Sequence, residues 1–192
     1  FPHQKVSKPL SVSDAISDLP KLNNGEEKSF YASKPNTKYQ YLMRDGERRL
    51  TNHKNGTYGL RMLEIMKLVK QGEGKNQINK LVDEGKASKE LYLTSGYRNS
   101  YGRLWWDKPS STITNNLSTP SSLRCIHPKQ NRALTSREGA RLQSFPDSFQ
   151  FYGSKTQVNI QIGNAVPPLL SIVLADSVKR FFLNNFDEDR GR

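Results

Sequence analysis

Cysteine and apolar residues are both scarce in this sequence. Cys125 is the only cysteine among 192 residues, so no disulfide can form within the chain, and this usage fits a reducing compartment. Apolar residues make up 34 % of the chain, below the usual share for a self-sufficient globular domain. We therefore expect a cytoplasmic protein that needs a partner surface to complete its core.

Two further absences concern membranes and the start of the chain. No apolar run approaches membrane-spanning length and no signal peptide is visible, so we expect no membrane partner. The sequence begins Phe1-Pro2 without an initiator Met, which predicts that it is a piece of something longer.

Positive charge, by contrast, is in excess. Thirty Lys and Arg residues against 18 Asp and Glu give a formal net charge of +12, and the pI is about 9.8. Such an excess favours a polyanionic partner, most often nucleic acid. A ribosome-like or merely soluble basic protein has the same composition, so charge alone leaves the partner open.

Residues 132–168 contain the most informative stretch of the chain. Thr135 followed by Glu138 has the spacing of a capping box, in which a hydroxyl and a carboxylate satisfy the first amides of a helix. Phe145-Pro146-Asp147 ends that helix. Gly163-Asn164 then predicts a tight turn, followed by an apolar helix over residues 169–182. A turn at a helix N-terminus can hold a polar ligand, although a helix, turn and helix in a core would look the same.

The remaining pattern predicts an α+β fold. Helical spacing occurs in residues 12–19 and in residues 60–70, where Leu60, Leu63 and Met66 face one way, and a weaker helix signal surrounds Ile78. Residues 39–43 suit either a strand or a short helix. Residues 91–98, 101–107 and 109–114 are rich in aromatic and β-branched side chains. Together these segments predict a small β-rich platform with flanking helices.

A cluster of cations and aromatic rings precedes that platform. Arg44, Arg48 and Arg49 lie close to Tyr39 and Tyr41 in the sequence. Cations neutralise a nucleic-acid backbone and neighbouring polar or aromatic groups orient it, so this run suits a phosphate-contacting loop. A solvated loop has the same composition.

Several motifs together carry a resemblance to a known family. Residues 132–147 and 161–168 resemble the last two conserved blocks of the DNA (cytosine-5)-methyltransferases. Residues 101–114 are similar to the end of the target recognition domain in that family, and Ile126-His127-Pro128 to the approach to the penultimate block. Residues 12–20 are similar to the segment before the recognition domain. The resemblance spans nearly the whole chain.

The resemblance implies a fold and an activity. In the family a Rossmann-like large domain binds S-adenosyl-L-methionine, and a small domain grips duplex DNA. The target cytosine is flipped out of the helix, a cysteine thiolate adds to its C6, and C5 takes the methyl group. By this comparison we expect residues 1–22 to be a connector, 23–130 the recognition domain, 131–157 the penultimate block, and 158–192 a cofactor-pocket turn and a helix returning to an absent catalytic domain.

The resemblance also identifies what the chain does not contain. The sequence has no Phe-x-Gly-x-Gly cofactor loop, no Pro-Cys-Gln nucleophile block, no Glu-Asn-Val block and no Gln-x-Arg-x-Arg block. Cys125 lies between Arg124 and Ile126, outside a Pro-Cys-Gln setting, and we expect it to be a small packing residue. We assign no catalytic residue and no metal ligand to this chain.

Residue roles follow from the matching motif positions. The resemblance implies that Asn164, Ala165 and Val166 contact S-adenosyl-L-methionine. It implies that Arg137 and Glu138 are structural, that Arg141 joins their polar network and that Asp147 closes the next turn. The expected DNA contacts are Thr112, Ile113, Thr114, Arg98, Arg103, Arg44, Arg48 and Arg49.

The sequence leaves three hypotheses about the function of the chain. The favoured one is the C-terminal portion of a DNA (cytosine-5)-methyltransferase, inactive alone, whose catalytic half lies in the same chain or in a separate subunit. A restriction-modification role is a further expectation of the resemblance. The second hypothesis is a non-catalytic DNA-binding module. The third, an RNA-directed relative, ranks last because residues 22–108 form a long basic region and those relatives have a short one.

Overall fold

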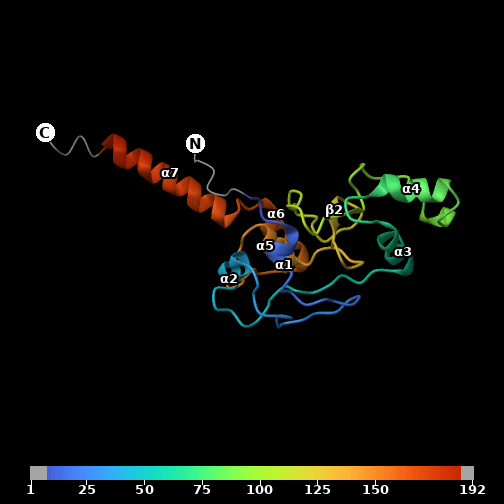
Figure 1. Ribbon diagram of the computed structural model, residues 1–192, viewed down its shortest axis with the longest axis horizontal. Coiled ribbons are helices and arrows are strands. Elements are labelled where there is room, and N and C mark those ends of the chain that lie inside the picture. Colours follow the sequence, from blue (N-terminus) through green and yellow to red (C-terminus); the bar gives the residue numbers. More distant parts are fainter. Residues whose placement is uncertain (1–7, 187–192) are drawn as a thin grey trace.

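The computed structural model describes residues 8–186 and is a mixture of helices and one small sheet. In chain order the elements are α1 (Val12–Ile16), α2 (Lys38–Arg44), α3 (Leu60–Leu68), α4 (Lys75–Asp83), the 3₁₀ turn η1 (Lys89–Leu91), β1 (Gly102–Arg103), β2 (Arg124–Ile126), α5 (Ser136–Leu142), α6 (Lys155–Asn164) and α7 (Pro168–Phe186). Helices α1, α2, α5 and α6 gather in the middle of the molecule, α3 and α4 lie at one end, and α7 projects from the other (Figure 1). The predicted α+β class is confirmed at this level.

The predicted β-rich platform is wrong in extent. The only sheet in the described residues is the parallel pair of β1 and β2, with Gly102 opposite Arg124 and Arg103 opposite Ile126. At Leu93 a side chain makes the backbone hydrogen bonds that a neighbouring strand would make. The Asn79 amide accepts a hydrogen bond from the Leu93 N–H at 2.9 Å and donates one to the Leu93 carbonyl at 3.0 Å. The aromatic and β-branched residues therefore pack on irregular backbone.

One hydrophobic cluster holds the middle of the molecule. Helix α1 begins with a capping box of Ser11 and Asp14, and its buried face packs on α5, which in turn packs on α6. The cluster extends to the loop residues Phe145 and Phe151, whose rings meet edge to face with centroids 5.1 Å apart. This cluster makes α5 the central element, because α1 and α6 each contact it.

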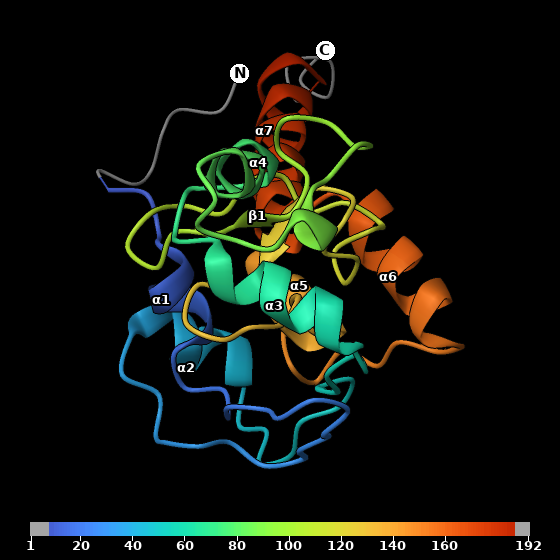
Figure 2. The same cartoon turned by 90° about the vertical axis from the view of Figure 1, so that its right-hand side faces the viewer.

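A second cluster joins α3 and α4 to the sheet. Its fully buried members include Ile65 and Met66 of α3, Ile78 of α4 and Ile126 of β2. Helix α4 confirms the weak signal around Ile78, and residues 39–43 fall in helix α2. The predicted inward face of α3 is wrong at Leu60, which is 82 % exposed, because it occupies the first turn and the cluster lies beside the last turn. The view from that end shows α3 in front of the core (Figure 2).

The predicted turn at Gly163-Asn164 is also wrong. Ser154 and Gln157 form a capping box that starts α6, a helix that the sequence pattern did not indicate, and Gly163 and Asn164 are its last two residues. The chain straightens only at Ala165, with φ −75° and ψ 146°. Pro167 disfavours helical backbone at Val166, the residue before it, so the helix cannot continue past this point. The predicted apolar helix is confirmed as α7, Pro168–Phe186.

Helix α7 carries exposed apolar side chains. Leu170, Ile172, Leu174 and Val178 are between 42 % and 57 % exposed. Within the described residues one helical stretch, Lys155–Asn184, is long and apolar enough to cross a membrane by length and composition, with a mean hydropathy of 1.5 in its best window and 17 % of that window buried. The expectation that no apolar run approaches this length is therefore wrong, although one such helix is weak evidence for a membrane.

We expect Gly163→Ala to destabilise the fold. A Cβ at residue 163 would overlap the backbone of Thr114 and Asn115, which cannot move without separating α6 from that segment. Overpacking of this kind costs about 1–3 kcal/mol, which lowers the thermal midpoint by several degrees in a chain of this size. Thermal unfolding followed by circular dichroism measures the shift. Gly59→Ala is the control, because nothing lies within 4 Å of its Cβ position; equal losses in both variants would contradict the close approach.

Candidate functional site

Helix α5 carries a buried ion pair at its N-terminus. Arg132 and Glu138 are each 1 % exposed. The Arg132 guanidinium donates to both carboxylate oxygens of Glu138, at 2.8 and 2.6 Å. The predicted capping box is confirmed, since Glu138 Oε2 accepts from the Thr135 N–H at 2.8 Å while Thr135 Oγ1 accepts from the Glu138 N–H at 3.2 Å. Burial alone would raise the pKa of Glu138, but the charge and hydrogen bonds of Arg132 outweigh it and hold the pKa far below 4.5.

A second buried pair lies at the other end of α5. Arg141 donates to Asp147 at 2.7 and 2.6 Å and to Asp18 at 3.2 Å. The Tyr31 hydroxyl donates to Asp147 at 2.5 Å. All three charged side chains are at most 2 % exposed. The pair therefore joins α5 to the segment after α1 and to the turn that follows α5.

Arg137 ties α5 to a third segment. Its guanidinium donates to the Thr51 carbonyl at 2.9 Å and to the Thr51 hydroxyl at 2.6 Å. The Arg137 side chain is completely buried. The three residues predicted to be structural, Arg137, Glu138 and Arg141, are thus all buried and bonded inside the molecule, where none can reach a ligand directly.

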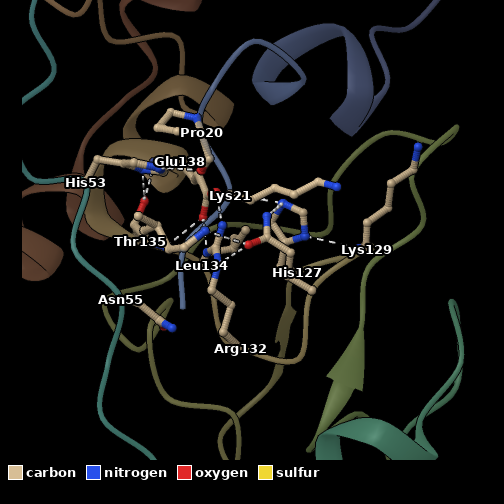
Figure 3. A network of polar contacts seen from close by, with 12 residues as sticks. Pro20, Lys21, His53, Asn55, His127, Lys129, Arg132, Leu134, Thr135 and Glu138 are labelled. Atoms are coloured by element: carbon tan, nitrogen blue, oxygen red, sulfur yellow. Dashed lines mark hydrogen bonds and ion pairs between the residues drawn. The ribbon is translucent and has the colours of Figure 1, made fainter. Parts of the chain in front are cut away.

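Two histidines flank the Glu138 pair (Figure 3). His53 lies 3.0 Å from both Thr135 Oγ1 and the Pro20 carbonyl, and His127 Nδ1 accepts from the Lys129 N–H at 3.0 Å. Burial lowers the pKa of His53, and it lowers the pKa of His127 to about 3 despite the nearby Glu138 carboxylate. Both rings are therefore neutral at pH 7.

The structure divides the predicted DNA contacts into exposed and internal groups. Arg48, Arg49, Arg98 and Thr112 are exposed and Thr114 is half-buried, while Ile113 is buried at 7 % exposure in the central cluster. The exposed arginines are free to meet a polyanion. The buried Ile113 instead anchors the threonines on either side of it.

Arg103 does not lie on the surface. It is 5 % exposed, and its guanidinium donates to the carbonyls of Val69 and His127, both at 2.6 Å. Burial lowers its pKa to about 10. A phosphate could reach this group only by displacing those carbonyls, so the predicted DNA contact of Arg103 is replaced by a structural role between α3 and the turn after β2.

Arg44 is also engaged internally. It pairs with the fully buried Asp18 at 2.7 Å, and its guanidinium carbon stacks 3.6 Å from the centroid of the Tyr31 ring. The sequence places Arg44 beside Arg48 and Arg49, but the helix α2 turns it toward the Asp18 carboxylate. Its predicted DNA contact is likewise replaced by an internal one.

Sequence reasoning missed Arg124, which is half-buried and donates to the carbonyls of Glu73 at 3.0 Å and Arg103 at 2.8 Å. Arg124 stacks on Trp105, with its guanidinium carbon 4.6 Å from the ring centroid. Together with Arg98 and Asn99 it lines a polar cavity of about 450 Å³ beside the start of α4. No local pattern links residues that lie 26 positions apart, so only the fold brings Arg98 and Arg124 to one cavity.

The predicted cofactor residues lie beside the predicted DNA residues. Asn164 and Val166 are exposed and Ala165 is half-buried. The preceding Gly163 lies against the backbone of Thr114 and Asn115, a close approach that only a residue without Cβ permits. The end of α6 and the threonine segment therefore form one continuous surface.

Cys125 has the environment of a packing residue. It is 3 % exposed, and its thiol donates to the Thr119 carbonyl at 3.1 Å. Burial raises the pKa of this thiol to about 12. A thiolate is the nucleophilic form, so this cysteine is inert at neutral pH.

The buried histidines predict acid sensitivity. Because the pKa of His127 is lowered to about 3 in the folded state, the unfolded chain binds more protons below pH 6.5, and stability falls as the pH falls. From pH 7 to pH 5 we expect His127 alone to cost about 1–2 kcal/mol. Urea titrations at both pH values measure the loss, which His127→Gln should reduce and which Lys67→Gln, at an exposed site, should not. Equal losses in wild type and His127→Gln would overturn this assignment.

Comparisons with known proteins give the family. The sequence matches the family model described as C-5 cytosine-specific DNA methylase over residues 2–180. It is 35 % identical to type II methyltransferase M1.HphI of Haemophilus parahaemolyticus, over 96 % of this chain and 40 % of that protein. It is 32 % identical to DNA (cytosine-5)-methyltransferase CMT2 of Arabidopsis thaliana, over 93 % of this chain and 17 % of that protein.

A solved structure shares the fold. It is that of a candidate DNA modification methyltransferase encoded within a prophage (E. coli), with a TM-score of 0.65 and 22 % identity over 94 % of this chain and 49 % of that one. The chain thus spans about half, or less, of these proteins. Because the family model covers most of its length, the chain belongs to the C-5 cytosine-specific DNA methylase family.

Proposed function

We propose that this chain is the C-terminal, DNA-gripping part of a DNA (cytosine-5)-methyltransferase. The whole enzyme would transfer the methyl group of S-adenosyl-L-methionine to C5 of a flipped-out cytosine in duplex DNA. The observation that carries the proposal is the contact of Gly163 with Thr114 and Asn115. In a member of this family, that contact joins the expected cofactor residues to the expected DNA residues on one surface.

In this proposal the chain has four functional segments. Residues 1–22 connect to the catalytic domain, 23–130 form the target recognition domain, 131–157 brace it through α5, and 158–192 supply one cofactor wall and the returning helix. Residues 1–7 and 187–192 of these ranges lie outside the described residues. The expected location of the whole protein is the cytoplasm.

The cofactor wall is argued from the chemistry at the end of α6. Asn164 offers an exposed amide, and Ala165 and Val166 offer a small apolar surface beside it. An amide next to an apolar patch suits the polar and aliphatic parts of the methionine portion of S-adenosyl-L-methionine. When bound, that cofactor supplies the electrophilic methyl group, and these three residues would hold and orient it together with walls from the catalytic half.

The DNA surface in this proposal uses the cations that remain exposed. Arg48, Arg49 and Arg98 would contact phosphates, and Thr112 and Thr114 would contact the backbone near the flipped base. Arg124 is not added to them, because its guanidinium is bonded to the carbonyls of Glu73 and Arg103. Arg44 and Arg103 are excluded from this surface by their internal bonds.

Helix α7 is proposed to pack on the catalytic half. Its exposed Leu170, Leu174 and Val178 share one face of the helix and the exposed Ile172 lies on another. Burial of such apolar surface is favourable by roughly 25 cal/mol for each Å² removed from water. An apolar helix of this kind suits a protein partner better than DNA, because DNA phosphates are contacted by cationic side chains.

The proposal predicts that methyl transfer requires a catalytic half. The chain alone should move no tritiated methyl group from S-adenosyl-L-methionine to DNA, and adding a protein that contains the Pro-Cys-Gln block of the same enzyme should restore transfer. Ile172→Asp with Val178→Asp should abolish that rescue. Leu60→Asp, an equally apolar and exposed site at the far end of the molecule, should retain it.

The competing function, a non-catalytic DNA-binding module, is favoured by the lack of the nucleophile block and by the net charge of +12. It predicts salt-dependent duplex binding with no rescue of methyl transfer by any catalytic half. Transfer by this chain alone would contradict both functions.

A separate prediction concerns Cys125. In the reconstituted enzyme, Cys125→Ser should leave covalent trapping on 5-fluorocytosine DNA unchanged, because the thiol is buried and protonated. Trapping is measured as a complex that survives denaturing electrophoresis. The matched control is the cysteine of the Pro-Cys-Gln block changed to Ser, which should lose trapping. Loss in the Cys125 variant would show that this thiol is the nucleophile.

A further inference from the structure

A cavity lined by none of the residues assigned above to the cofactor or to DNA has no part in the function proposed above. It has a volume of about 680 Å³ and lies between the C-terminal end of α1 and the turn after β2. Its lining includes Lys21, Lys28 and Lys129, and no Asp or Glu side chain lines it. Figure 3 shows the side chains of Lys21 and Lys129 extending on the same side of His127, away from the buried Glu138 network.

Two of the three cavity lysines have no anionic partner among the described residues. Lys28 lies 3.2 Å from the Glu26 carboxylate. By contrast, no carboxylate within residues 8–186 lies within 4 Å of the Lys21 or Lys129 ammonium group, and Lys129 Nζ instead rests 4.3 Å from the centroid of the Trp106 ring. The cavity is therefore a concentrated positive site that attracts an anion.

The wall of the cavity is aromatic. Phe30 lines it and is 62 % exposed, and the Arg49 guanidinium carbon lies 5.6 Å from the centroid of the Phe30 ring. Tyr31 and Trp106 line it as well, above the buried floor residues Ile16, Leu19 and Pro20. An exposed ring beside unpaired cations suits a flat π-system that carries negative charge.

A polar edge completes the cavity. Gln130 lines it, and its side-chain oxygen accepts from the Leu22 N–H and from Arg132 Nε, both at 3.0 Å. Its side-chain nitrogen lies 3.3 Å from His127 Nε2, and His127 lines the cavity as well. A polar edge made of Gln130 and His127 suits a nucleobase better than an apolar peptide side chain.

We propose that this cavity binds one nucleotide unit, with the base against Phe30 and the phosphate between Lys21 and Lys129. The unit can be a free nucleotide or one unstacked nucleotide of a DNA strand. The second source rests on the proposed function, whereas the first does not.

Trp106 is a built-in reporter for this site. The sequence has two tryptophans, and Trp105 packs on Gly72 and Arg124 away from the cavity. In the full chain carrying Trp105→Phe, the remaining fluorescence comes from Trp106. We expect titration with thymidine monophosphate or with a twelve-residue oligothymidylate to quench it. Quenching by both indicates a free-nucleotide site, and quenching by the oligonucleotide alone indicates a strand site; each supports the proposal.

Variants test the assigned contacts. Phe30→Ala should weaken binding at least about five-fold. Lys21→Ala with Lys129→Ala should reduce the salt slope of oligothymidylate binding by roughly 0.7, the value for one phosphate contact on a single strand. Tyr152→Ala and Lys67→Ala, an exposed ring and an exposed cation elsewhere, should change neither quantity. Circular dichroism melts check that every variant folds.

Three results would overturn the proposal: no quenching by either probe, equal affinity in Phe30→Ala and wild type, or equal quenching by polyglutamate, which would make this a site for an acidic protein. These binding readouts need no methyl transfer. The cavity proposal can therefore fail while the methyltransferase proposal stands, and the methyltransferase proposal can fail while the cavity proposal stands.

Discussion

The two buried ion pairs of α5 set the arrangement of everything around them. Removing a guanidinium and a carboxylate from water costs several kcal/mol, and the cost is recovered only when geometry and further hydrogen bonds are nearly complete. Arg132 with Glu138, and Arg141 with Asp147 and Asp18, meet that condition. A displaced α1 or a shifted turn after α5 would leave a buried charge without its partner. These pairs therefore determine how the segments are placed relative to one another more than they add to the free energy of unfolding.

The sequence predicted well where the determining contacts are local. The Thr135 and Glu138 capping box closes within one helical turn, so its spacing contains the whole interaction. The apolar run after Pro168 predicted α7 for the same reason. The roles of Arg44 and Arg103 could not be predicted in this way. The partner of Arg44 is the Asp18 carboxylate, 26 residues away, and those of Arg103 are the Val69 and His127 carbonyls, 34 and 24 residues away. The residues next to an arginine in the sequence do not indicate such distant partners, so a buried arginine cannot be told from an exposed one.

Gly163 illustrates a different limit of sequence reasoning. A glycine followed by asparagine favours a turn, and that pattern predicted the wrong backbone here because α6 continues through both residues. The glycine is needed for a contact with residues 114 and 115, which lie almost fifty positions earlier. The local sequence pattern indicates that a small residue is required at position 163. It does not indicate whether the reason is backbone freedom or the close approach of another segment. The family resemblance supplied a separate expected role for each of the two segments, and the fold supplies their contact.

The burial of charge also explains why one chain presents two such different surfaces. Among the described residues four arginines are buried (103, 132, 137 and 141) against three buried carboxylates (18, 138 and 147). The interior is thus close to neutral, and nearly all of the net charge of +12 remains on the exterior. That exterior suits a polyanion, which the body of the molecule can meet with the exposed Arg48, Arg49 and Arg98. The exposed apolar side chains of α7 suit a protein surface instead. A polyanion held by the body and a protein partner held by α7 would then occupy separate faces, joined through the contact between α6 and the threonine segment.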